Sequence, residues 1–271
     1  MEENLEQKIL SWLNTQGYGV EMKVATSLNA AGCEVIQSWF YSDPETGNSR
    51  EIDVVGQMND EIGLLKLHSV IECKKSSKPW VLFTSDRATF NRVRSFAIMT
   101  DEALGAIINN IQRMIEIDWF RKDGRVAYGI TEAFTSKNDE TFKAGMTATK
   151  AALALLKSEA NPSGRNILSF FFPTVVLDGR LFECYLGADG GPVLGEVDSA
   201  FLLFPIRLSE YVGASVRIVT LGAFNRYCEE FTSVYHSLRR EIAEEIAKLA
   251  ASLGIKPEVL HDVMKDSRNL D

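Results

Sequence analysis

Three short apolar segments, separated by turn-forming residues, follow one another closely in the first third of the chain. They span Cys33–Tyr41, Arg50–Gly56 and Gly63–Lys74 and are rich in valine, isoleucine and aromatic residues, which favour strands. The intervening segments, Ser42–Asn48 and Asn59–Glu61, consist of residues that favour tight turns. Consecutive strands joined by tight turns predict an antiparallel meander, which restricts this part of the chain to a sheet-based fold.

The rest of the chain alternates between helical and strand-like patterns. Helices are predicted at Leu5–Leu13, Val20–Ala31, Asp86–Ile98, Asp101–Trp119, Thr141–Leu156 and Phe224–Leu253, with one short helix in Lys256–Asp271. Strands are predicted at Trp80–Phe83, Ile167–Phe171, Thr174–Leu177, Leu181–Leu186, Ala200–Ile206 and Val216–Leu221, with a hairpin turn at Asp178–Gly179. This order predicts an α/β (α+β) fold, with a mixed central sheet flanked by helices, extra C-terminal strands and a long terminal helix.

Residues 1–271 are expected to form a single domain, in which residues 161–271 extend the sheet and end in the long helix. Asn161–Gly164 resembles a linker, but strands after it can still join the same sheet. Apolar residues of the last helix recur at a spacing of three and four, as in a coiled-coil seam. They are Phe224, Cys228, Phe231, Tyr235, Leu238, Ile242, Leu249 and Leu253. This pattern suits either packing on the chain's own sheet or a homodimer contact.

Three charged residues lie within the apolar strands of the meander. Asp53 belongs to the second strand, and Glu72 and Lys74 belong to the third. Alternate side chains of a strand share a face, so Glu72 and Lys74 point the same way, and Asp53 can lie beside Glu72 if the strands pair. Half-buried carboxylates repel each other unless a cation joins them, and Mg²⁺ prefers such oxygen ligands. The sequence therefore predicts a metal site at one end of this sheet.

Asp53, followed 19 positions later by Glu72-Cys73-Lys74, resembles the PD-(D/E)XK nuclease superfamily, which has the restriction-endonuclease-like fold. The resemblance covers roughly residues 17–95, and its phrases are most similar to Mrr-type restriction enzymes and resolvase-like nucleases. The chain departs from the name motif because Ile52 stands where proline is expected. Glu-x-Lys also occurs twice in predicted helices, so the strand context, not the triplet, carries the resemblance.

The resemblance implies a role for each residue of the motif. Asp53 and Glu72 would bind Mg²⁺, or Mn²⁺ as a substitute, together with the main-chain carbonyl of Cys73. Lys74 would position or activate the attacking water. Glu21, on the preceding predicted helix, would complete the acidic cluster. The implied reaction is hydrolysis of phosphodiester bonds by a metal-dependent endonuclease.

Plainer interpretations stand beside these roles. Asp53 or Glu72 could form an ordinary surface salt bridge with Lys74, which would contribute little to stability. Glu21 could be a helix-surface residue paired with Lys23 or a neighbour. The basic residues Lys75 and Lys78 could contact phosphates next to the site.

Two further residue types have a structural and a functional interpretation. Trp80 could stack on a base or pack in the core. The four cysteines, at positions 33, 73, 184 and 228, are too far apart for a zinc site and are expected to be small apolar core residues.

Lys and Arg number 29 against 37 Asp and Glu, so the net charge is −8 and bulk attraction to nucleic acid is weak. The expected partner is nucleic acid, with DNA preferred and a role in restriction or phage defence implied by family habit. Two alternatives remain: a catalytically inactive module that binds nucleic acid or protein, and an RNA-directed or partner-gated nuclease. The polar N-terminus and the absence of a long apolar run favour a cytoplasmic protein without membrane contact.

Overall fold

The computed structural model describes residues 4–15, 17–85, 97–121, 125–135, 140–159, 167–208 and 211–255. Its helices are α1 (Leu5–Thr15), α2 (Tyr18–Ala30), α4 (Asp101–Asn109), α5 (Ile111–Met114), α6 (Asp118–Arg121), α7 (Glu140–Glu159), α8 (Phe224–Glu241) and α9 (Ala243–Ser252), with a 3₁₀ turn at Leu221–Ala223. Its strands are β1 (Glu34–Ser42), β2 (Ser49–Asn59), β3 (Leu65–Lys75), β4 (Trp80–Ser85), β5 (Ile98–Met99), β6 (Val126–Glu132), β7 (Leu168–Asp178), β8 (Leu181–Leu186), β9 (Pro192–Glu196), β10 (Ser199–Leu208) and β11 (Tyr211–Thr220).

All described strands belong to one mixed sheet, in the order β1-β2-β3-β7-β11-β10-β6-β4-β8-β9, with β5 paired to β7. The predicted meander is confirmed, because β1 pairs antiparallel with β2 and β2 pairs antiparallel with β3. Strand β7 then lies parallel to β3, and β11 lies parallel to β7. The carboxyl ends of these three strands therefore meet at one edge of the sheet.

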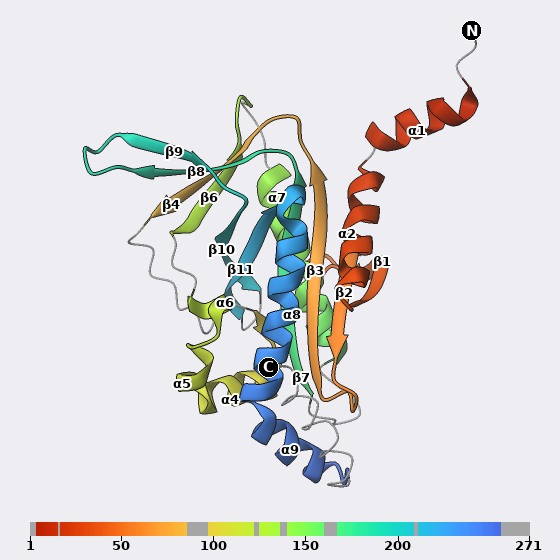
Figure 1. Ribbon diagram of the computed structural model, residues 1–271, viewed down its shortest axis with the longest axis vertical. Helices are drawn as coiled ribbons and strands as arrows, with labels where there is room; N and C mark the ends of the chain where they lie inside the picture. Colours follow the sequence, from red (N-terminus) through yellow and green to blue (C-terminus); the bar gives the residue numbers. More distant parts are fainter. Residues whose placement is uncertain are drawn as a thin grey trace.

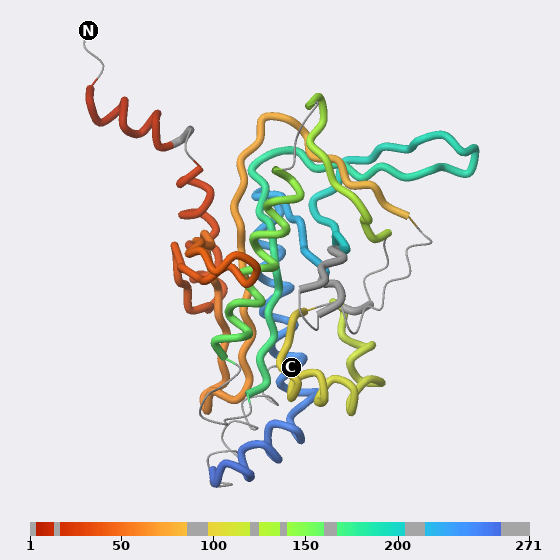
Figure 2. Tube along the Cα trace, turned by 180° about the vertical axis from the view of Figure 1, so that it is seen from behind, coloured from red at the N-terminus to blue at the C-terminus, as the bar shows by residue number. Residues whose placement is uncertain are grey.

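Helices cover both faces of this sheet. Figure 1 shows α2 and α8 side by side on one face, and Figure 2, from behind, shows α7 across the other. One apolar core lies under α2, α4, α8 and α9 and includes Leu28, Ile71, Phe170 and Phe231. A second core lies under the alanine-rich α7 and includes Trp80. The mixed α/β architecture expected from the sequence is thus present.

The seam of the last predicted helix faces the chain's own core. Phe224, Cys228, Phe231, Tyr235 and Leu238 are all at least 96% buried in the monomer. These side chains pack on the sheet and on α2, which is the first of the two interpretations of the seam. A homodimer remains a prediction, and its contacts would have to come from other residues.

Two predicted helices are broken in the structure. The segment Asp101–Trp119 forms α4, α5 and part of α6, because Asn110 leaves the helical conformation and its side-chain amide donates to the carbonyl of Ala106. The expected long helix Phe224–Leu253 is divided at Ile242, whose φ of −107° separates α8 from α9. The division directs Ile246 into the same core.

Several strand predictions also need correction. The two segments around Pro173 form one continuous strand, β7, in which Pro173 lies between the residues paired with β5 and those paired with β11. Proline lacks an N–H to donate, and it is accommodated because the edge of β7 opposite β3 has no paired residue at this position. The predicted hairpin at Asp178–Gly179 is wrong, because β8 pairs with β4 and β9 and not with β7. Strands β6 and β9 were not predicted.

Some predictions fall outside the described residues. They are most of the helix predicted at Asp86–Ile98, the linker-like Asn161–Gly164 and the short helix in Lys256–Asp271. Ile98, at the end of the first of these, belongs to β5. Among the helices that the structure does describe, none combines the length and the apolar character needed to cross a membrane.

Candidate active site

The site begins where the pairing of β2 with β3 ends. Val54 lies opposite Ile71 in the last regular pair at this end of the ladder. Beyond it, the Asp53 side chain replaces the missing backbone acceptor, and its Oδ2 accepts a hydrogen bond from the Cys73 N–H at 2.6 Å. The N–H and C=O of one residue in an extended strand point to the same side, so the Cys73 carbonyl also faces Asp53. The hydrogen bond therefore places Asp53 of β2 beside Cys73, the central residue of the Glu72-Cys73-Lys74 triplet in β3.

The other edge of β2 is irregular at the same position. Gln37 pairs with Val54 and Trp39 pairs with Ile52, so Ser38 of β1 lies opposite Asp53. Ser38 has a φ of 54°, in the left-handed region that non-glycine residues seldom adopt. At Asp53, the pairing of β2 is therefore irregular with β1 and has ended with β3. The Asp53 carboxylate can then contact the backbone of Cys73.

Glu72 and Lys74 form an ion pair on one face of β3. The Lys74 Nζ lies 2.5 Å from Glu72 Oε1, as expected for side chains two residues apart in a strand. Glu72 is only 7% exposed, and its second oxygen, Oε2, is buried without a hydrogen-bond partner among the described atoms. A buried carboxylate oxygen without a partner is costly, so this position favours a proton or a cation.

The protonation of this cluster reflects its burial. Burial, together with the Asp53 charge, raises the pKa of Glu72 to about 7, although Lys74 opposes the shift. Burial also raises the pKa of Asp53, while the Cys73 N–H and Lys74 lower it in part. For Lys74, burial acts to lower the pKa, but the contact with Glu72 outweighs it and the pKa is raised. The positive charge of Lys74 therefore does not fully offset the burial of Asp53 and Glu72, and the pKa values of both carboxyl groups stay raised.

Glu21 joins the cluster electrostatically from the first turn of α2. Burial raises the pKa of Glu21, and the charges of Asp53 and Glu51 raise it further. Glu21 and Lys23 form no ion pair among the described residues, so the structure does not support a pairing of Glu21 with Lys23. Glu51 was missed by the sequence analysis, although its position two residues before Asp53 in β2 could have indicated it.

The donor set suits a hard divalent cation. Asp53, Glu72 with its orphaned oxygen and the Cys73 carbonyl offer only oxygen ligands, and Mg²⁺ commonly takes one or two carboxylates and completes its shell with water. Within the described residues, no group of three or more His, Cys, Asp and Glu side chains is arranged to hold a metal. A site here would therefore depend on two carboxylates, the carbonyl and waters.

The basic residues Lys75, at the end of β3, and Lys78, just after it, lie near this edge of the sheet. Lys75 is exposed, and its Nζ lies 4.0 Å from Asp178 Oδ2. Lys78 is half-buried in the turn before β4, where its N–H donates to Ser76 Oγ at 3.1 Å. Trp80 is 2% exposed and belongs to the core beneath α7, which confirms the core interpretation of this residue.

Comparison with known proteins gives no relative for this chain. No protein-family model, no curated protein and no solved structure matches it.

Proposed function

We propose that this protein is a Mg²⁺-dependent nuclease of the PD-(D/E)XK type that hydrolyses phosphodiester bonds. The observation that supports it best is the pairing of Glu72, buried with one oxygen unpartnered, with Asp53 and Lys74 at the end of the β2–β3 ladder. Two neighbouring carboxylates repel each other, which makes their ionised forms unfavourable unless a cation binds between them. The meander β1–β3, with α2 before it and β7 added in parallel, supports a restriction-endonuclease-like core.

Each side chain then has a separate task. Bound Mg²⁺ would polarise the phosphate and lower the pKa of a water. Asp53 and Glu72 hold the cation with the Cys73 carbonyl, and Glu21 adds negative charge from α2 for a water or second ion. Lys74, released from part of its contact with Glu72 when a cation binds, orients the attacking water and stabilises negative charge on the phosphate.

DNA is the preferred substrate of this proposal, and RNA is its main competitor. A net charge of −8 gives little bulk attraction to either polymer, so binding depends on the metal and on local cations such as Lys75 and Lys78. Restriction or phage defence would suit such an enzyme, because it would not bind every nucleic acid that it meets.

A direct test incubates the protein with Mg²⁺ and with single-stranded, duplex and branched DNA and RNA. Lys74→Ala and Asp53→Ala are assayed beside the wild type, with Lys157→Gln, an exposed lysine of α7, as a control for loss of one positive charge. We expect Mg²⁺-dependent cleavage by the wild type and the control alone. Equal behaviour of all four proteins on every substrate contradicts the proposal.

The ion pair between Lys74 and Glu72 favours a second candidate, a nuclease-fold module that binds nucleic acid without cleaving it. In that case the pair is a structural salt bridge and needs no metal. Binding of the polymer without cleavage, and no shift of the unfolding temperature by Mg²⁺, would identify this function.

A further inference from the structure

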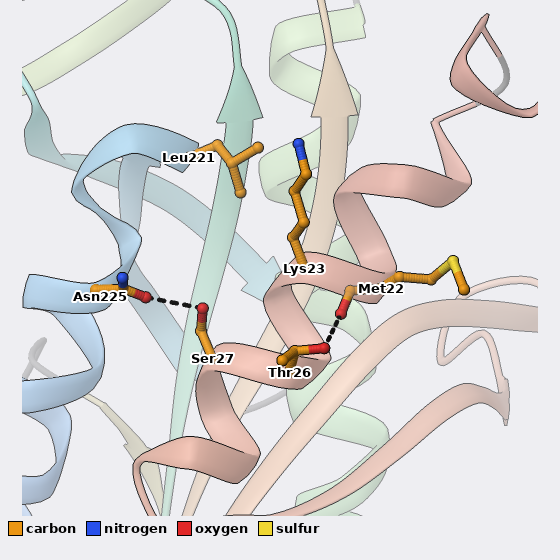
Figure 3. Close-up of a pocket in the computed structure, with 6 residues that line it drawn as sticks. All are labelled: Met22, Lys23, Thr26, Ser27, Leu221 and Asn225. Carbon is orange, nitrogen blue, oxygen red and sulfur yellow. Dashed lines mark hydrogen bonds between the residues drawn. The ribbon is translucent and has the colours of Figure 1, made fainter. Parts of the chain in front are cut away.

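A groove with both polar and apolar lining residues lies on the other side of α2 from the carboxylate cluster. It has a volume of about 390 Å³ and lies between α2 and the start of α8. Its lining residues are Met22, Lys23, Thr26, Ser27, Leu221 and Asn225. In Figure 3, Lys23 extends from α2 alongside Leu221, and Ser27 faces Asn225 across the groove. None of the six is acidic, in a chain whose net charge is −8.

The hydrogen bonds within the groove leave donors available. Ser27 Oγ donates to Asn225 Oδ1 at 2.8 Å, so the amide nitrogen of Asn225 has no described partner and can donate to a ligand. Thr26 donates to the carbonyl of Met22 at 2.8 Å. The Lys23 ammonium forms no ion pair with a described carboxylate, and it carries three donors. A cation and an amide donor, with no carboxylate among the lining residues, suit an anion such as a phosphate ester.

The groove opens at the same edge of the sheet as the candidate active site. Leu221 directly follows the end of β11, and Lys74 lies at the end of β3, and both strands run parallel to β7 between them. Helix α2 carries Glu21 of the cluster and, within the next turn, Lys23 of the groove.

We infer that this groove binds a backbone phosphate of the nucleic-acid strand that is cut, with Lys23 and Asn225 as its donors and Leu221 against the sugar. The inference rests on the proposed function, because it places the groove on the strand that enters the carboxylate cluster. Contacts to phosphate fix the position of a strand and carry no base sequence, so the groove would set register and not specificity.

The test measures binding without cleavage. Fluorescence anisotropy follows labelled single-stranded DNA, duplex DNA and RNA in Ca²⁺, from 50 to 200 mM salt, with wild type, Lys23→Gln and Asn225→Asp. Lys157→Gln, at the far end of α7, changes the net charge as Lys23→Gln does. We expect Lys23→Gln to weaken binding about three- to tenfold and to reduce the salt slope by about 0.7–0.9, as for one lost phosphate contact. Asn225→Asp, which keeps an acceptor for Ser27, should also weaken binding.

Two results overturn the inference. One is equal binding by Lys23→Gln and Lys157→Gln. The other is Lys23-dependent binding of inorganic phosphate, measured by titration calorimetry, with no change in oligonucleotide binding, which would indicate a small-anion site. Because this assay needs no turnover, it is independent of the cleavage test. If the protein never cleaves but binds nucleic acid in a Lys23-dependent way, the nuclease proposal is contradicted and the phosphate-binding groove is supported. If the protein cleaves but its binding does not depend on Lys23, the groove inference is contradicted and the nuclease proposal is supported.

Discussion

The backbone N–H of Cys73 donates to the Asp53 carboxylate at 2.6 Å, at the point where β2 and β3 stop pairing. This contact connects the two halves of the sequence motif, because it holds the Asp of one strand beside the Glu-x-Lys of the next. It also aims the Cys73 carbonyl at the same space.

Asp53→Asn should abolish cleavage without unfolding the protein. The amide oxygen can still accept from the Cys73 N–H, while the loss of charge removes repulsion between buried carboxyl groups. We expect cleavage to fall by at least about 100-fold, as for loss of a group that stabilises the transition state, with an unfolding temperature equal to or above that of the wild type. A rate assay and thermal unfolding measure both quantities. A folded variant with wild-type cleavage would contradict the assignment of Asp53.

Glu72 should make stability and metal binding depend on pH. Its pKa is raised to about 7 from 4.5, so the native state holds a proton that the unfolded state releases, and stability is lost as the pH rises from 4.5 to 7. The full effect is about 3 kcal/mol at 1.36 kcal/mol per pKa unit. Mg²⁺ needs the ionised carboxylate, so it should raise the unfolding temperature more at pH 8 than at pH 6. Glu72→Gln should remove this difference, and an unchanged Mg²⁺ response in that variant would argue against a Glu72 ligand.

Lys74→Gln should separate catalysis from metal binding. The lysine is not a metal ligand in the proposed site, so the Mg²⁺-induced rise in unfolding temperature should persist, while cleavage falls by about 100-fold or more. Lys157→Gln, which removes one positive charge from the exposed surface of α7, is the control and should retain cleavage. If Lys74→Gln loses Mg²⁺ stabilisation, or if its cleavage equals that of Lys157→Gln, the assigned role of Lys74 is incorrect.

Glu21→Gln should have a smaller effect than changes at Asp53 or Glu72. Glu21 reaches the cluster through charge, and no described hydrogen bond joins it to Asp53 or Glu72. We expect a roughly tenfold lower cleavage rate with little change in stability, as for an outer partner of a metal site. Titration of the Mg²⁺ dependence should show whether the loss appears as a higher metal requirement. A rate equal to that of wild type at every Mg²⁺ concentration would make Glu21 a bystander.

Glu159 provides a stability prediction far from the site. Its carboxylate, at the end of α7, accepts from Ser169 Oγ at 2.5 Å and lies 3.2 Å from His68 Nε2 and 3.3 Å from Lys66 Nζ. Burial acts to raise its pKa, but these contacts outweigh burial and lower the pKa to about 2. Such an acid stabilises the fold above pH 4.5 and loses this contribution as the pH falls toward 2.

Glu159→Gln should therefore lower the free energy of unfolding by about 2 to 3 kcal/mol at pH 7 and by much less at pH 2.5. Urea unfolding at the two pH values measures the difference. Glu140→Gln, at the exposed start of the same helix, is the control and should change stability little. A pH-independent loss in Glu159→Gln would point to packing in place of charge.

The sequence predicts the meander well because its signals are local. Alternating apolar residues and compact turns determine β1 to β3, and alternation along β3 places Glu72 and Lys74 on one face. Partner choice across the rest of the sheet is not local. The Asp178–Gly179 signal has the residues of a hairpin, yet β8 pairs with β4, about 100 positions earlier, because the open edge of β4 is available there. The exposed pattern of β9 and the glycine at position 129, in the middle of β6, carry little strand signal.

The sequence indicates the charged residues of the candidate site but not the backbone geometry around them. Asp53, Glu72 and Lys74 stand out as charges within apolar strands, whereas the left-handed Ser38 and the end of the β2–β3 ladder follow from tertiary pairing. Lys23 was considered only as a partner for Glu21. Its position in a groove depends on contact between α2 and α8. The hydrogen bond that joins these helices links Ser27 to Asn225, which is 198 positions later in the sequence.

The parallel pairing of β3 with β7 has a consequence for how the protein is made. Leu65 pairs with Leu168, so β3 obtains its neighbour only after about 100 further residues have been synthesised. A nascent chain that ends before β7 carries Asp53, Glu72 and Lys74 but leaves one edge of β3 unpaired. Contacts between such distant residues form slowly. Both edges of β3 would therefore be paired only after β7 has been synthesised, and a chain that ends earlier would carry the proposed site on an incomplete sheet.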